Sequence, residues 1–164
     1  MFKAIIALGN IGEEYVKTYH NVGVLVAKEI SSTANDSGKD LLLYEPKTFM
    51  NVSGPAILSW MKMRNLKIEE VLIVHDEGDL LVGEYKISSC GGSAGHNGIA
   101  SVISAFKTEE FYRLRIGIRD PNEKERRKTL DFVLNNWSSS EEKVFLEVAK
   151  KAYAELASSF LQAS

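Results

Sequence analysis

The fold is decided by one stretch, Val71-Leu72-Ile73-Val74-His75-Asp76-Glu77-Gly78-Asp79. Its first four residues are apolar, which is typical of a strand buried on both faces of a parallel sheet. Polar and charged side chains follow directly, at the predicted carboxyl end of that strand. Binding sites of open α/β sheets form just beyond the carboxyl ends of the strands. We therefore expect Asp76 to take part in chemistry.

The overall composition is that of one compact domain with a real core. The chain has 164 residues, of which 45% are hydrophobic and 26% are charged, and we expect a single domain over residues 1–164. The formal net charge is -2 and the pI is about 6.0. Because no global positive field results, any contact with nucleic acid needs a local basic patch.

The single cysteine, Cys90, excludes an intrachain disulfide and any zinc site built on two or more thiolates. It indicates a reducing compartment, and a buried, inert thiol is the expected state. The first eight residues are too short for the apolar core of a signal peptide, and no apolar run reaches membrane-spanning length. We expect a cytoplasmic protein that has no contact with membranes.

Strand and helix patterns alternate along the chain. Strands are predicted over residues 2–8, 41–44, 71–74, 83–87 and 111–118, and helices over 13–19, 22–30, 55–63, 99–106 and from about 138 onward. Ser138 and Glu141 form a predicted capping box for the last helix. The polar segment 31–39 is predicted to be a loop. The pattern predicts a single-domain α/β sandwich, with a twisted, mixed, largely parallel sheet flanked by helices on both faces.

Polar residues stand where successive segments end; they are Asn10, His20, Asn51, Asp76 and Asn97. Three are asparagines, which hold substrates or water but do not titrate. One imidazole beside one carboxylate makes a general base with a partner that fixes its tautomer. Because no serine lies in a nucleophile context, water is the natural nucleophile. We interpret His75 and His96 as structural and choose His20 as the base.

Two further stretches are candidates for phosphate contacts. The glycine-rich segment Gly91–Gly98 lacks the Lys-Ser/Thr ending of a P-loop and is a weak nucleotide motif. Arg113 and Arg115 share one face of the strand predicted over residues 111–118 and are the sharper phosphate candidates. The cluster 124–128 mixes basic and acidic residues, and it is about equally compatible with RNA contact and with a solvated turn.

Taken together, these motifs resemble those of the bacterial peptidyl-tRNA hydrolase family. The matching pieces run in order along nearly the whole chain: Leu8-Gly9-Asn10 with Gly12, Tyr15, His20-Asn21-Val22-Gly23, Thr48-Phe49-Met50-Asn51, Ser53-Gly54, His75-Asp76-Glu77 with Asp79-Leu80, Gly95-His96-Asn97-Gly98 and Arg113-Leu114-Arg115-Ile116-Gly117-Ile118. As a set they are highly specific.

The resemblance implies a cytoplasmic, monomeric esterase without metal or other cofactor that cleaves the ester between a peptide and the terminal ribose of tRNA. It implies that His20 activates water, that Asp76 orients His20, and that Asn10 helps distinguish N-blocked peptidyl-tRNA from aminoacyl-tRNA. Substrate-binding roles are implied for Tyr15, Phe49, Met50, Asn51 and Asn97.

The chain departs from the family pattern at several positions. Ile11 stands where the family usually has proline. Lys86 matches a basic position that the resemblance implies for contact with tRNA, but Ser88 stands where a second lysine is common. The segment between His20 and Asn51 is shorter than usual, and the predicted loop 31–39 replaces a strand or hairpin there.

Two alternative functions remain open from the sequence. One is a non-catalytic RNA-binding relative on the same scaffold, and the other is a small-ester hydrolase without tRNA selectivity. The complete set of candidate site residues favours the enzyme over the pure binder, because a binder needs no base with an orienting carboxylate.

Overall fold

The computed structural model describes residues 1–159. Within this range one five-stranded sheet has the order β2-β1-β3-β5-β4, and only β4 runs antiparallel to its neighbour. The strands are β1 Ala4–Ala7, β2 Leu42–Tyr44, β3 Val71–Leu81, β4 Tyr85–Ser88 and β5 Tyr112–Arg119. The helices are α1 Val22–Asp36, α2 Ser53–Met63, α3 Asn97–Phe106 and α4 Ser139–Ser159. The predicted mixed, largely parallel sheet is confirmed.

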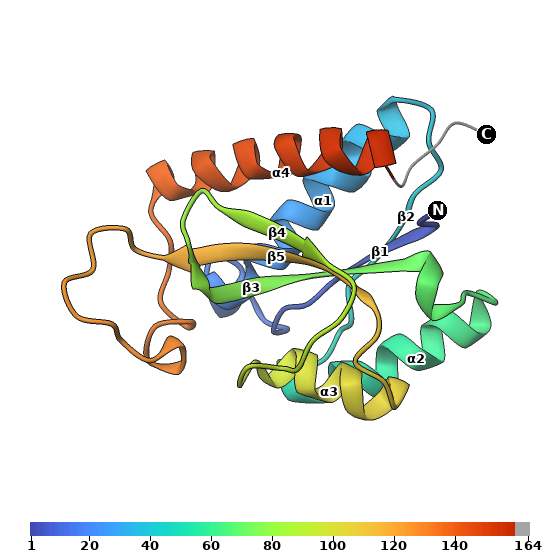
Figure 1. Ribbon diagram of the computed structural model, residues 1–164, viewed down its shortest axis with the longest axis horizontal. Helices are drawn as coiled ribbons and strands as arrows, with labels where there is room; N and C mark the ends of the chain where they lie inside the picture. Colours follow the sequence, from blue (N-terminus) through green and yellow to red (C-terminus); the bar gives the residue numbers. More distant parts are fainter. Residues whose placement is uncertain (160–164) are drawn as a thin grey trace.

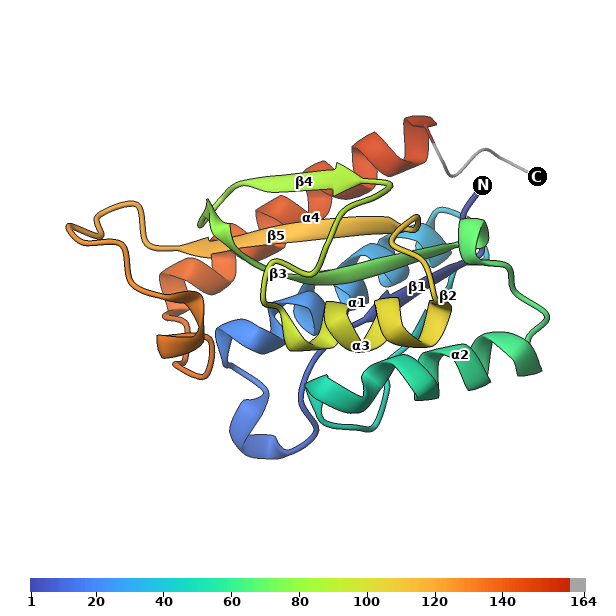
Figure 2. The same ribbon diagram turned by 60° about the horizontal axis from the view of Figure 1, so that its bottom comes forward.

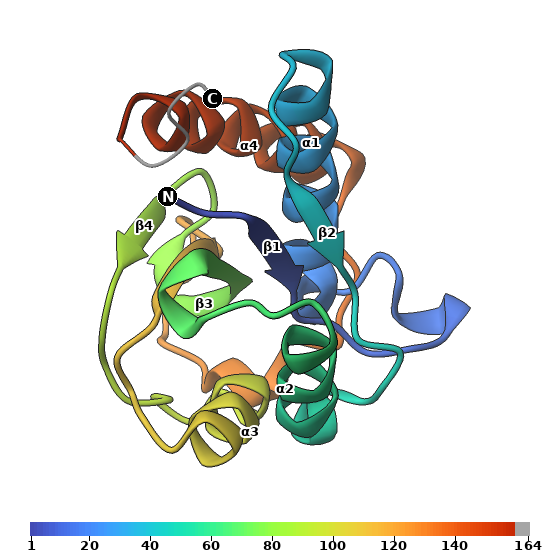
Figure 3. The same ribbon diagram turned by 90° about the vertical axis from the view of Figure 1, so that its right-hand side faces the viewer.

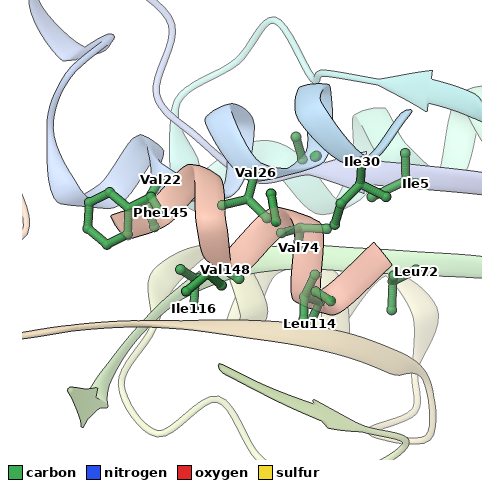
Figure 4. Packing of buried hydrophobic residues seen from close by; sticks show 14 of the residues in the cluster. Ile5, Val22, Val26, Ile30, Leu72, Val74, Leu114, Ile116, Phe145 and Val148 are labelled. Carbon is green, nitrogen blue, oxygen red and sulfur yellow. The ribbon is translucent and has the colours of Figure 1, made fainter. Parts of the chain in front are cut away.

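Helices cover both faces of the sheet, as predicted. Figures 1 and 3 show α1 and α4 on one face and α2 and α3 on the other. The side chains of β3 alternate accordingly: Leu72 and Val74 belong to the core cluster beneath α1 and α4, whereas Val71 and Ile73 belong to the opposite cluster. Figure 4 shows the first cluster, where Val26 and Val148 pack over the sheet. Each valine, leucine or isoleucine buried in this way contributes about 1.5–3 kcal/mol.

The central strand β3 is longer than predicted. The strand does not end at Val74 but continues to Leu81, because β5 keeps pairing with it as far as Glu77 opposite Gly117, and again at Leu81. β1 stops earlier, at Ala7 opposite Val74. Asp76 therefore lies beyond the end of one neighbouring strand while the other still holds its backbone. This combination gives the buried side chain of Asp76 a rigid support at the edge of the sheet where the site forms.

The predicted loop over residues 31–39 is wrong, because α1 continues to Asp36. Ala34 extends the buried apolar face of the helix by one turn beyond Ile30. The polar side chains are also satisfied in the helix: Thr33 Oγ1 donates to the Glu29 carbonyl (2.8 Å) and Ser31 Oγ donates to the Leu41 carbonyl (3.3 Å). Small polar residues are poor helix formers alone, but here tertiary packing decides.

Two regions flank the end of the sheet where Asp76 lies. The segment 9–21 consists of turns with two short 3-10 helices, Glu13–Tyr15 and Tyr19–Asn21, instead of the predicted helix over residues 13–19. The connection between β5 and α4 is irregular apart from a 3-10 turn over Thr129–Asp131. It extends beyond the end of the sheet in Figure 2. The capping box that closes it is confirmed, since Glu141 N donates to Ser138 Oγ (3.2 Å) and Ser138 N donates to Glu141 Oε2 (2.7 Å).

No helix among residues 1–159 has both the length and the hydropathy that are needed to cross a membrane.

Candidate active site

His20 and Asp76 meet in the folded chain, as the sequence predicts. His20 lies in the 3-10 turn that leads into α1, and its backbone N–H donates to the Val133 carbonyl at 2.8 Å. Its Nδ1 atom lies 2.9 Å from both carboxylate oxygens of Asp76. Because an ionised carboxylate only accepts hydrogen bonds, Nδ1 carries the proton. In the neutral ring, Nε2 therefore keeps its lone pair.

His96 contacts the same carboxylate, which was not predicted. Its Nδ1 accepts hydrogen bonds from the backbone N–H groups of Gly98 (3.1 Å) and Ile99 (3.2 Å) at the start of α3. In the neutral ring Nε2 must then carry the proton, and it lies 2.7 Å from Asp76 Oδ1. His96 thus caps a helix, as its structural interpretation implies, and also belongs to the site. No local sequence signal identifies this contact, because it depends on how α3 docks on the sheet.

All three histidines of the chain gather at Asp76. The third, His75, is buried, and its Nδ1 lies 2.6 Å from the backbone carbonyl of Asp76. Burial lowers the pKa of His75 to about 3, helped by the nearby His96. His75 is therefore neutral at physiological pH, and its Nδ1–H donates to the Asp76 carbonyl.

Asp76 is ionised in spite of its burial. Its exposed fraction is 1%. Burial by itself raises the pKa of this carboxyl group, but His96 and then His20 hold the pKa well below its ordinary value. The two imidazole N–H donors replace the water that the carboxylate loses. Asp76 is therefore a fixed negative charge beneath the His20 ring.

Asn10 is held rigidly by Asn21, the residue that follows His20 in the chain. The Asn21 side chain bonds both backbone groups of Asn10, since its Oδ1 accepts from Asn10 N (2.8 Å) and its Nδ2 donates to Asn10 O (2.9 Å). Asn10 Oδ1 accepts from the Met50 backbone N–H at 2.8 Å. With its oxygen engaged in this way, Asn10 presents its amide NH₂ group as a donor.

A cavity of about 400 Å³ opens beside His20, Asp76 and His96. Its outer wall is the segment between β5 and α4, which contributes the basic residues Arg126, Arg127 and Lys128. Asn10 lines a second cavity of about 340 Å³, together with Asn21, Val24 and Lys28. His20 and Asn10 thus line two distinct cavities.

Comparison with known proteins shows the family of the chain. A family model described as Peptidyl-tRNA hydrolase matches residues 4–164. The chain belongs to the peptidyl-tRNA hydrolase family. It is 41% identical over 162 residues to a peptidyl-tRNA hydrolase of Sulfurihydrogenibium sp., covering 90% of this chain and 84% of the relative. It is 37% identical to the protein of the same name from Aquifex aeolicus, covering 92% and 85%.

A solved structure of this family has the same fold. The crystal structure of peptidyl-tRNA hydrolase from Acinetobacter baumannii superposes with a TM-score of 0.80 at 30% identity, covering 94% of this chain and 86% of that one.

The substrate-binding residues implied by the family resemblance occupy different environments. Phe49 is 53% exposed and packs edge-on against Tyr15, with the ring centroids 6.3 Å apart. Asn51 and Asn97 are exposed at the starts of a 3-10 turn and of α3. Met50, by contrast, is buried in the core against Gly98, so its side chain packs beneath the surface and does not line it.

The donor atoms of His20, Asp76 and His96 lie within 4.8 Å of one another, which is close enough to hold a metal ion. The hydrogen bonds argue against this use. His96 would have to bind a metal through Nε2, and Nδ1 would then carry the proton. That proton would face the N–H groups of Gly98 and Ile99. The residues therefore fit two histidines held by an ionised carboxylate better than a metal centre.

The predicted basic face exists, but both of its arginines are already engaged within the fold. Arg113 and Arg115 do share one face of β5, and Arg115 forms an ion pair with Glu77 at 2.7 Å. Arg113 is buried, and its guanidinium donates to the carbonyl oxygens of Gly91, Gly92 and Glu109. The expectation of a buried thiol is wrong, since Cys90 is exposed on the loop that follows β4.

Proposed function

We propose that the chain hydrolyses the ester bond between an N-blocked peptide and the 3′-terminal ribose of tRNA, with His20 as the general base. The observation that carries this proposal is the contact of His20 Nδ1 with both oxygens of Asp76 at 2.9 Å. It leaves Nε2 as the acceptor on a ring that cannot change its tautomer. This is the arrangement that proton abstraction from water requires.

The reaction follows from this proton inventory. His20 Nε2 takes a proton from water while the water oxygen attacks the ester carbonyl carbon. The tetrahedral intermediate then collapses, the bond to the ribose oxygen breaks, and His20 Nε2–H returns the proton to that oxygen. Asp76 stabilises the transient imidazolium. General-base help of this kind contributes about 10²- to 10⁴-fold in rate.

Asn10 supplies selectivity in this scheme. Its free amide NH₂ donates to a carbonyl oxygen of the substrate, which an N-blocked peptide offers next to the ester. A free aminoacyl group carries an ammonium there instead. Since an ammonium only donates, it finds no acceptor on the Asn10 side chain.

The linings of the two cavities differ, and in this proposal they determine which end of the substrate each cavity holds. The wall of the cavity beside His20 carries Arg126, Arg127 and Lys128, and we assign the phosphates at the tRNA end to this side. Arg126 is paired with Asp79 and Arg127 with Glu123, so the phosphates would compete with these carboxylates. The side of Asn10, Tyr15 and Phe49 suits the peptide, because exposed aromatic rings offer apolar contact. Asn51 and Asn97 line neither cavity, and in this proposal they contact the substrate from the exposed surface. The protein works as a metal-free monomer in the cytoplasm in this proposal.

Release of N-acetyl-aminoacyl product from tRNA tests the proposal, with the same tRNA carrying a free amino group as the matched substrate. We expect the blocked ester to be cleaved and the free one to be spared. The Asn10→Ala variant should lose part of this discrimination. Increasing salt should weaken the apparent affinity steeply, because phosphate contacts release counterions. Equal cleavage of both substrates without salt dependence would instead identify a small-ester hydrolase.

A further inference from the structure

The last residue of β5, Arg119, connects the sheet to the wall segment of the active-site cavity, which we define as residues 120–138. Arg119 is buried, with 9% of the residue exposed, and it lines the same cavity as His20 and Asp76. Its Nε atom donates to the Gly78 carbonyl of β3 at 2.6 Å. That carbonyl lies two residues beyond Asp76 on the same strand. The sheet side of this connection is therefore next to the orienting carboxylate.

On the wall side, the guanidinium of Arg119 contacts a side chain, the backbone and a ring. Its Nη1 atom donates to Glu123 Oε2 (2.5 Å) and to the Arg127 carbonyl (3.1 Å). Glu123 is also bound by the Nε (2.8 Å) and the backbone N–H (3.0 Å) of Arg127. The guanidinium of Arg119 lies over the Phe132 ring, 5.5 Å from its centroid. One side chain thus connects three positions of the wall segment to β3.

The wall segment also packs directly on this stretch of β3. A Cβ atom at Gly78 would lie 2.0 Å from Thr129 Oγ1 and 2.7 Å from Thr129 Cβ. Thr129 begins the 3-10 turn Thr129–Asp131. Because the threonine side chain is short, it cannot move aside unless the turn moves with it. The absence of a side chain at residue 78 therefore lets the wall segment lie against the strand.

Farther along, the wall segment holds the backbone of the proposed base. The His20 N–H donates to the Val133 carbonyl at 2.8 Å. Asp76, the partner of His20, belongs to β3. The contact of 2.9 Å between His20 Nδ1 and Asp76 thus joins a residue held by the wall segment to a residue of the sheet. Arg119 binds both parts, so it can fix one relative to the other.

We propose that Arg119 is a positioning residue for hydrolysis, which holds the wall segment against β3 and thereby keeps His20 in place over Asp76. The inference deepens the proposed function, on which it rests for the role of His20. Arg119 acts on His20 through the wall segment and takes no part in the proton transfer itself. A displacement of a catalytic group by about 1 Å costs about 10²-fold in rate.

Hydrogen–deuterium exchange of the His20 backbone amide measures this positioning without any need for activity. Arg119→Met keeps an apolar side chain over Phe132 but removes the hydrogen bonds to β3 and to the wall segment. We expect the His20 amide to exchange about tenfold faster in this variant than in wild type, because the wall segment then opens locally. The Leu8 amide, which donates to β3 at 2.9 Å, should exchange as in wild type.

Arg64→Met is the matched control. The Arg64 guanidinium also lies over an aromatic ring, 5.7 Å from the centroid of Trp60, but this residue is exposed at the end of α2. Its exchange at His20 should equal that of wild type. Single-turnover cleavage of N-acetyl-aminoacyl-tRNA at saturating enzyme reports the chemical step independently of affinity. We expect this rate to fall about ten- to a hundredfold in Arg119→Met and to stay unchanged in Arg64→Met.

Gly78→Ala tests the same junction while Arg119 is still present. Its methyl group should push Thr129 and the wall segment away from β3, so the exchange at His20 should also become faster. This second variant keeps the test informative should Arg119→Met fail to fold. Unchanged exchange at His20 in both variants would overturn the inference. Equal acceleration at His20 and Leu8 would also overturn it, because it would show a general loss of stability.

The failure of this inference can be distinguished from the failure of the proposed function. If His20→Ala is inactive while Arg119→Met exchanges and cleaves like wild type, only the inference fails. If Arg119→Met shows the faster exchange at His20 but His20→Ala cleaves at the full rate, the positioning by Arg119 is supported and the proposed role of His20 is contradicted.

Discussion

The Nε2 atom of His96 lies 2.7 Å from Oδ1 of Asp76, the same oxygen that His20 Nδ1 approaches at 2.9 Å. Asp76 is thus held by two histidines, His20 and the His96 that caps the first turn of α3. The position of His20 therefore depends on how α3 docks on the sheet.

Removal of this anchor should lower turnover more than substrate affinity. His96→Ala deletes one N–H donor to a buried carboxylate, an interaction worth about 1.5–3 kcal/mol. We expect kcat to fall about ten- to a hundredfold, while KM changes little. Steady-state hydrolysis of an N-blocked aminoacyl-tRNA measures both constants. His96→Asn, which can still cap α3, separates the loss of the helix cap from the loss of the contact with Asp76. An increase in KM with an unchanged kcat would contradict the role assigned to His96.

His75 should make the fold sensitive to mild acid. Its pKa is about 3 in the folded chain, against about 6.5 when unfolded. Between these values the unfolded chain binds a proton that the folded chain does not, so stability falls as the pH decreases, by on the order of 1 kcal/mol per pH unit. The pKa of Asp76 is also lowered in the folded chain, but this carboxyl group reduces the free energy of unfolding only below about pH 4, where it begins to be protonated in the unfolded chain.

Urea unfolding between pH 6.5 and pH 4.5 isolates the contribution of His75. We expect the stability of wild type to decline across this window and that of His75→Asn to decline less. Parallel curves for the two proteins would show that His75 is not the titrating group.

Close packing between α2 and α3 should be intolerant of a methyl group at Gly54. A Cβ atom there would lie 2.0 Å from the Ser101 carbonyl oxygen of α3. Gly54→Ala should therefore destabilise the protein by about 1–3 kcal/mol and, since α3 carries His96, also lower activity. Gly92→Ala is the matched control for stability, because the nearest atom to its Cβ would be 3.8 Å away. Equal melting temperatures for the two variants would contradict this packing.

Much of the fold follows from local pattern. The buried run Val71–Val74 and the alternating strand of β5 predict a sheet with two covered faces, and the structure has both. The pairing of His20 with Asp76 was also predictable. Asp76 follows the buried run of β3, His20 precedes α1, and both positions meet at one edge of the sheet. Local chemistry marks where polar groups interrupt apolar runs, and the topology of a parallel sheet brings those places together.

Other features depend on long-range packing and were mispredicted. The end of α1 is fixed by Ala34 in the core, not by the small polar residues around it. The length of β3 is fixed by its partner β5. His96 reaches Asp76 only through the docking of α3, and Arg113 is buried only because the loop over residues 90–94 folds over it.

Single-turnover cleavage of N-acetyl-aminoacyl-tRNA by wild type and by His20→Ala, with tRNA binding measured on the same samples, tests the role of His20 most directly. We expect His20→Ala to lose cleavage but to bind tRNA as wild type does, because His20 moves a proton and its side chain is almost fully buried. Cleavage at an undiminished rate, or equal loss of cleavage and binding, would contradict the role of His20 as the general base.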